Sequence, residues 1–255
     1  MSAVNLVYNT SIKEDLGHKL SQVRNRFTDE MGGLMFKKDY IMRMIEQFTN
    51  VVAKIMGLKA ADKFEEIHLV LNEALYDFTG LSESALERLS YKDLINLVSG
   101  FEEINTVKCF ILAELLKEKA DTFASLGDVD QSNNLYIKSF NINVEVMLSN
   151  QSASLEPDYD TIDQTIDKIK QIPLPYETQT LRLRYYEKMM KYDKAEDLLF
   201  ELLDQGADKK TVLAEGIAFY ERIMKLKPEE LEKGNLPLDE VLEALEIFKG
   251  SPLPN

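Results

Sequence analysis

The chain has 255 residues, of which 45% are apolar and 29% charged, a composition typical of a globular protein with a buried core and unlike that of a disordered one. Acidic residues outnumber basic ones by 44 to 30, so the formal net charge is −14, which disfavours a nucleic-acid partner. The single cysteine, Cys109, excludes an intramolecular disulfide and a cysteine-based zinc site.

The sequence also indicates where in the cell the protein is found. The longest apolar runs are far shorter than the roughly 20 residues that span a bilayer, and the N-terminal sequence lacks the basic start and sustained apolar stretch of a signal peptide. We therefore expect a cytoplasmic protein that does not interact with a membrane.

The apolar neighbours of Cys109 predict a buried thiol rather than a reactive one.

The first 34 residues carry a clean helical pattern. Gly32-Gly33 follows this pattern as a signal for the end of a helix. The apolar residues recur at steps of three or four positions: Ile12, Leu16, Leu20, Val23, Phe27 and Met31. Two explanations are open for this leader, because Met35 opens a capped amphipathic segment that resembles a protein start. It is either an added helix or sequence upstream of the natural start, and we expect the helix.

The rest of the chain predicts further helices and no strands. Only 11 glycines and 7 prolines interrupt it, and no stretch alternates with a period of two. Ser90 followed by Asp93 predicts a helix cap. The polar stretch "SNQSASLEPDYD" suggests a boundary, which gives three regions: 1–34, 35–150 and 151–255. The expected helices lie at about 36–57, 60–78, 104–127, 128–149, 160–171, 176–190, 192–205, 209–226 and 238–249, with shorter ones over 81–99.

One pair of these helices carries a repeat pattern in "LKEKADTFASLGDVDQSNNLYIKSF". Small residues let two antiparallel helices approach closely, and a Gly-Asp turn connects them. The spacing is that of the tetratricopeptide repeat: Leu116, Ala120, Phe123, Gly127, Asp128, Ser132, Tyr136 and Ser139.

Two further segments repeat parts of this scheme. "LRLRYYEKMMKYDKAEDLLFELLDQG" follows it with Met190 in place of the glycine, and "ADKFEEIHLVLNEAL" resembles a second helix of such a pair. We therefore predict an all-α fold of antiparallel helical hairpins, stacked as a tetratricopeptide-like array. An irregular helical bundle with coincidental small residues is the alternative.

The segment "MFKKDYIMRMIEQF" resembles the start of an uncharacterised family of small helical proteins from Gram-positive bacteria. Members begin with Met, an aromatic residue, and Asp-Tyr, then an apolar pair, Arg and Ile-Glu-Gln. The matching positions are Met35, Phe36, Asp39, Tyr40, Ile41, Met42, Arg43, Ile45, Glu46 and Gln47. The resemblance covers roughly the middle half of the chain and implies a helical fold and a bacterial origin, but no activity.

Two groups of residues are candidates for contact with a partner. The first is the family-like polar patch on one helix: Asp39, Tyr40, Arg43, Glu46 and Gln47. These residues either form solvated pairs at i,i+3 and i,i+4 spacing or make a surface that positions a partner. The second combines basic and aromatic residues, which are favoured as interface anchors: Arg182, Arg184, Tyr185, Lys188 and Tyr192.

Catalytic and cofactor-binding constellations are sparse. Glu65 with His68, and Asp15 with His18, have the i,i+3 spacing of helical di-iron sites, but half-exposed histidines on helix faces are the alternative that we favour. With two histidines and one cysteine, no nucleophile arrangement suggests itself, and no phosphate-binding loop is present.

We therefore predict a non-catalytic module that binds a protein or peptide, with no cofactor and with a homodimer as an option. A metal-dependent helical-bundle enzyme and a peptide-responsive regulator are the alternatives. The regulator is suggested because "LGHKLSQVRNRFTDEM" resembles the first helix of bacterial helix-turn-helix proteins, but no basic recognition helix follows it.

Overall fold

The computed structural model describes residues 35–100, 105–149, 159–204 and 208–250. Twelve helices and no strand occur in these ranges, which confirms the all-α prediction. The expected leader helix lies outside the described residues. No helix in the described ranges is long and apolar enough to cross a bilayer.

The chain divides into two compact units, Met1–Pro173 and Leu174–Asn255. The helices of the first unit are α2 (Met35–Lys59), α3 (Phe64–Thr79), α4 (Glu83–Arg88), α5 (Tyr91–Ser99), α6 (Thr106–Leu126), α7 (Val129–Leu148) and α8 (Tyr159–Ile169). Those of the second are α9 (Tyr176–Lys188), α10 (Tyr192–Asp204), α11 (Lys209–Ile223), α12 (Pro228–Lys233) and α13 (Leu238–Gly250).

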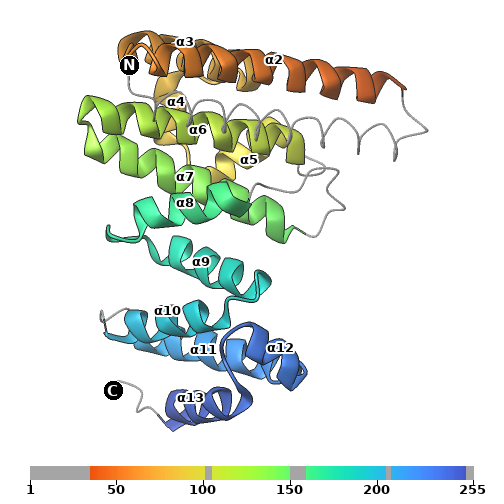
Figure 1. Cartoon of the computed structure of the whole chain (residues 1–255), viewed down its shortest axis with the longest axis vertical. Coiled ribbons are helices and arrows are strands. Elements are labelled where there is room, and N and C mark those ends of the chain that lie inside the picture. Colours follow the sequence, from red (N-terminus) through yellow and green to blue (C-terminus); the bar gives the residue numbers. More distant parts are fainter. Residues whose placement is uncertain (1–34, 101–104, 150–158, 205–207, 251–255) are drawn as a thin grey trace. The chain divides into compact units, whose positions relative to one another are not determined.

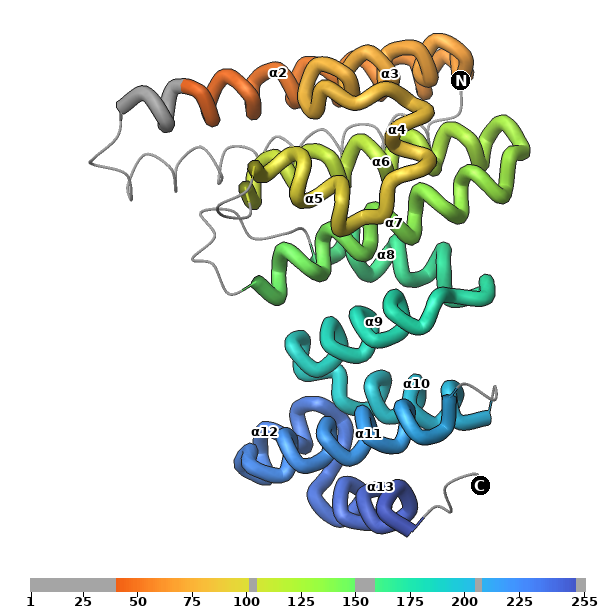
Figure 2. Tube along the Cα trace, turned by 180° about the vertical axis from the view of Figure 1, so that it is seen from behind, coloured from red at the N-terminus to blue at the C-terminus, as the bar shows by residue number. Residues whose placement is uncertain are grey.

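In the first unit α6 is the central helix. It packs against α3 on one side and against α5 and α7 on others, while α2 packs on α3 and α8 on α7 (Figure 1). The reverse view also shows α2 beside α3 and α6 beside α7 (Figure 2). Helix α6 is apolar around most of its circumference, as expected for a helix covered on several sides. Cys109 on this helix is fully buried, as predicted, and burial raises the pKa of its thiol.

The contact between α6 and α7 depends on small residues. Ala120 and Ser139 are fully buried, and Ser132 is 3% exposed. The Ser132 hydroxyl donates to the carbonyl of Ala120 at 2.9 Å, and the Ser139 hydroxyl donates to that of Ala113 at 2.8 Å. These positions belong to the predicted repeat pattern. The two helices therefore approach closely enough for side chains of one to bond the backbone of the other.

Four hairpins share one type of turn. After α6, Gly127 has φ +84°, the amide of Asp128 donates to the carbonyl of Phe123, and the amide of Gly127 donates to that of Ala124. This is a Schellman motif, which ends a helix with one left-handed residue. The same pair of hydrogen bonds ends α2, α9 and α12, where the left-handed residues are Asp62, Met190 and Asn235.

In the second unit α9 packs on α10, α10 on α11, and α11 on α13. Phe248 of α13 lies against Gly216 of α11, where a Cβ atom would come within 2.3 Å of the ring. The Phe248 ring also meets Tyr220 and Phe200 in edge-on contacts at 5.4 and 5.3 Å. Gly216 thus makes room for the aromatic side chain that joins these helices.

Two expectations differ from the observed fold. The segment "KPEELEKGNLP", expected as a connection, contains α12, which begins with a proline and is capped by the Glu230 carboxylate on the amide of Lys227. The expected boundary after residue 150 falls inside the first unit, because α8 packs on α7 and the units divide at Pro173.

The left-handed turns generate a prediction about stability. Met190→Gly is expected to stabilise the protein by about 1 kcal/mol, because a side chain is disfavoured at φ +52° and that of Met190 is 52% exposed. The matched change Gly127→Ala should destabilise it by a similar amount at the equivalent turn. Urea denaturation followed by circular dichroism measures both. A destabilised Met190→Gly protein would contradict this account of the turn.

Replacement of two helical glycines by alanine should change the stability of the protein in opposite directions. Gly216→Ala is expected to cost about 1–3 kcal/mol, since the new methyl group collides with the Phe248 ring. Gly57→Ala in α2 meets no atom within 4 Å and should stabilise by about 0.5–1 kcal/mol through helix propensity. Thermal unfolding of the two variants tests the pair, and equal shifts in Tm would contradict the close approach of α11 and α13.

Candidate functional site

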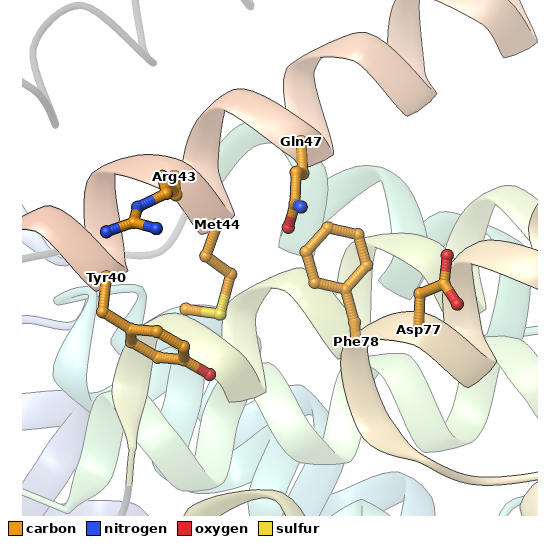
Figure 3. A pocket seen from close by; sticks show the side chains of 6 residues that line it. All are labelled: Tyr40, Arg43, Met44, Gln47, Asp77 and Phe78. Atoms are coloured by element: carbon orange, nitrogen blue, oxygen red, sulfur yellow. The ribbon is translucent and has the colours of Figure 1, made fainter.

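A pocket of about 330 Å³ lies between α2 and the C-terminal end of α3. Its lining comes from these two helices alone: Tyr40, Arg43, Met44, Gln47, Asp77 and Phe78. In Figure 3, Arg43 and Asp77 stand at opposite ends, with Met44, Gln47 and Phe78 between them. The pocket therefore has an apolar middle and an oppositely charged group at each end.

The helical period of α2 explains why polar and apolar residues both reach this site. Met44, with 5% exposure, belongs to the buried face, whereas Arg43 and Gln47 lie on the exposed face of the same turns. Below them Phe78 meets Phe48 edge-on with ring centroids 6.5 Å apart. Phe48 in turn meets Phe110 of α6 at 6.5 Å, so the floor is continuous with the core.

The two charged side chains of the pocket do not interact with other charged or polar side chains of the described residues. Neither Arg43 nor Asp77 forms an ion pair or a hydrogen bond with any residue of the described ranges. By contrast, Arg222 donates two hydrogen bonds of 2.7 Å to the carboxylate of Glu187. A guanidinium without such a partner keeps its planar donor fork available for a ligand carboxylate.

Tyr40 forms one end of the pocket and is 53% exposed. The ammonium group of Lys108 on α6 lies 5.9 Å from the centre of its ring, a cation–π contact that links α2 to α6. The phenol therefore has a fixed neighbour while much of its surface faces solvent.

The structure brings together three of the five residues in the family-like patch. Tyr40, Arg43 and Gln47 line the pocket, whereas Glu46 is exposed but does not line it, and the side chain of Asp39 lies outside the described residues. Solvated i,i+3 and i,i+4 pairs are one of the two interpretations of this patch, and no hydrogen bond or ion pair of Arg43 with Glu46 or Gln47 is observed in the described part of the chain.

Sequence reasoning missed Asp77 and Phe78, because they come from a different helix. Nothing in the sequence placed Phe78 opposite Gln47. The hairpin turn after α2 sets this register, which local patterns do not encode.

The second candidate group is divided by the structure. Arg184 and Lys188 are exposed, but Tyr185 is fully buried and Arg182 and Tyr192 are 8% and 4% exposed. The buried three therefore do not present surface for direct contact with a partner. A binding role for Arg184 and Lys188 stays a prediction.

Local contacts explain why these side chains turn inward. The Arg182 guanidinium donates to the Tyr186 hydroxyl and the Gln179 amide oxygen, each at 3.3 Å. Tyr192 packs on Gly234, where a Cβ atom would lie 2.1 Å from the ring. Aromatic and basic residues that look like interface anchors thus serve the packing of α9, α10 and the α12–α13 turn.

The histidine considered for a metal site contacts a carboxylate other than that of Glu65. His68 Nε2 lies 3.4 Å from Glu83 Oε1 and 3.1 Å from the Asn72 amide nitrogen, while Glu65 is exposed. No three metal-ligating side chains gather within the described ranges. The other pair, Asp15 and His18, lies outside them.

Lys119 completes a polar network at this place. It is 2% exposed, and its ammonium group lies 2.6 Å from Glu83 Oε1 and 2.5 Å from the Asn72 amide oxygen. Burial raises the pKa of Glu83, but the hydrogen bond and charge of Lys119 outweigh it and hold that pKa below its usual value. The network joins α3, α4 and α6, which assigns it a structural role.

Removing Lys119 should reveal this role. Lys119→Met is expected to destabilise the protein by about 1–3 kcal/mol at neutral pH, whereas Lys54→Met on the exposed face of α2 should change stability by less than about 0.5 kcal/mol. Because the folded-state pKa of Glu83 is lowered, its contribution is present above the ordinary carboxyl pKa and is lost as pH falls through the lowered value. Urea denaturation at several pH values should therefore show the cost of Lys119→Met shrinking in acid. A cost that is independent of pH would contradict the network.

Comparison with known proteins gives one match. The model of a family described as "Family of unknown function (DUF6483)" matches residues 35–251, which include the pocket and every described helix. Residues 1–34 lie outside the match. No curated protein and no solved structure matches the chain.

Proposed function

Because the chain belongs to the DUF6483 family, whose function is unknown, we propose a function from its own structure: the protein binds a segment of another protein, or a peptide, in the pocket between α2 and α3. The single observation that carries this proposal is the lining of the pocket. An apolar floor of Met44 and Phe78 lies between two charged side chains that have no described partner. Binding sites typically combine apolar surface with a few placed polar groups that fix the orientation of the ligand.

The same lining favours binding over catalysis. It offers one carboxylate, one guanidinium, one amide and one phenol, and no two of these groups are hydrogen-bonded to each other in the described part of the chain. Nucleophilic catalysis typically uses a nucleophile and a base within hydrogen-bond reach of each other, which this lining does not offer. In this proposal the module recognises its ligand without transforming it.

The arrangement of the helices supports the further proposal of tetratricopeptide-like repeats. Hairpins α2–α3, α6–α7 and α9–α10 all turn through a Schellman motif, and α6 and α7 approach through small residues. Helical repeats commonly use exposed hairpin surfaces to bind peptides. In this proposal the protein acts in the cytoplasm, consistent with its buried, single cysteine.

A library of displayed 12-residue peptides tests the proposal. Peptides are selected on the wild-type protein, and their affinities are then measured for Gln47→Trp, which places an indole in the pocket, and for Asn50→Trp. Asn50 is exposed on the same helix but does not line the pocket, so it is the matched control. Selected peptides should bind Gln47→Trp at least about tenfold more weakly, as expected when a binding pocket is filled, and bind Asn50→Trp unchanged.

Two outcomes would contradict the proposed function. One is the absence of any peptide that survives selection. The other is a set of peptides that bind wild type, Gln47→Trp and Asn50→Trp equally, since they would occupy another surface. Circular dichroism of both variants verifies that the helices are retained.

A further inference from the structure

Resting on the proposed function, we infer the chemistry of the ligand: a peptide segment that inserts one large apolar side chain between Met44 and Phe78, and carries an acidic group toward Arg43 and a basic group toward Asp77. The pocket would therefore select its ligand by the order of its charges as well as by its anchor. The volume of the pocket, the apolar residues of its floor and the charged side chains at its two ends each support this inference.

The volume limits what can enter. About 330 Å³ lies at the lower end of the roughly 300–1,000 Å³ that small-molecule sites occupy. This space accommodates one large side chain with adjoining backbone. A segment that extends beyond the pocket would lie over the exposed residues at its two ends.

The floor specifies an apolar anchor. The Phe78 ring rests on Phe48, and Phe48 on Phe110, so the aromatic surface is supported from the core. Met44 adds a flexible thioether that adapts to rings and branched chains and makes favourable contacts with aromatic groups. Leucine, methionine or an aromatic residue of the ligand would bury its surface here, whereas a charged anchor would be desolvated without a partner.

The ends of the pocket specify opposite charges. Arg43 and Asp77 have no partner among the described residues and stand at opposite ends in Figure 3. Lys54 of α2 and Glu73 of α3 are also exposed, but they do not line the pocket. A uniformly basic ligand would meet Arg43 as a like charge, and a uniformly acidic one would meet Asp77, so complementarity requires one of each.

The strongest competing site is the network of His68, Asn72, Glu83 and Lys119. Its groups already bond one another at 2.5–3.4 Å, and His68 does not line the pocket. The pocket therefore provides the better basis for ligand recognition.

A charge-swapped protein, Arg43→Glu with Asp77→Lys, tests the inference. Both residues are exposed, so the swap should leave the fold intact, which circular dichroism verifies. The same displayed library is selected on the wild type and on the swapped protein. Peptides from the wild type should contain an apolar residue flanked by one acidic and one basic residue in a fixed order, and peptides from the swapped protein should show the reverse order.

Synthetic peptides make the comparison quantitative. The best peptide from the wild type and its counterpart with acid and base exchanged are titrated into both proteins by fluorescence anisotropy. Since hydrogen bonds to charged groups contribute strongly to affinity, each protein should prefer its own peptide by about tenfold or more. Lys54→Glu with Glu73→Lys provides the matched control outside the pocket and should change the preference much less.

The possible results separate the two proposals. In one result, peptides bind Gln47→Trp more weakly than the wild type but bind the wild-type and charge-swapped proteins with equal affinity. Such peptides would overturn the inference and leave the proposed function standing. If no peptide depends on Gln47, both fail. Self-association of the wild-type protein that Gln47→Trp abolishes, measured by sedimentation, would identify a second copy of this chain as the occupant and would also overturn the inference.

Discussion

The close contact of α6 with α7 is the interaction on which the rest of the first unit depends. Ala120, Ser132 and Ser139 have side chains small enough for the helices to meet, and the serine hydroxyls are satisfied by carbonyl groups of α6. A larger residue would separate the helices, and a polar residue without such an acceptor would be buried at a cost. With α7 covering one side, the remaining apolar faces of α6 are left for α3 and α5.

This arrangement explains why the candidate pocket forms where it does. Helix α3 uses its apolar face on α6 and α2, so its C-terminal end brings Asp77 and Phe78 beside α2. The network of Asn72, Glu83 and Lys119 fixes α3 and α4 on α6 through a buried ammonium group and a carboxylate that stays partly exposed. A packing that removed Glu83 would leave the buried Lys119 charge without its partner, at a cost in free energy. A rigid base of this kind suits a recognition site, because little order is lost on binding.

The hairpin turns show how different residues solve the same backbone problem. Gly127 adopts the left-handed conformation without steric cost, whereas Met190 adopts it with a side chain. Asparagine and aspartate, found at the other two turns, tolerate this conformation better than most residues. The repeated hydrogen-bond pair, rather than a repeated amino acid, is therefore what these hairpins share, which explains why the repeat pattern is weak in sequence.

The sequence by itself determined the features that depend on neighbours along the chain. The helical period predicted the all-α fold, Ser90 and Asp93 predicted the cap that begins α5, and the apolar surroundings of Cys109 predicted its burial. Only the tertiary structure decided that Arg182 and Tyr185 face inward, that His68 meets Glu83 rather than Glu65, and that Gln47 faces Phe78 across a pocket. The physical reason is that a helical period fixes which residues share a face, whereas the neighbour that covers this face is set by packing between helices distant in sequence.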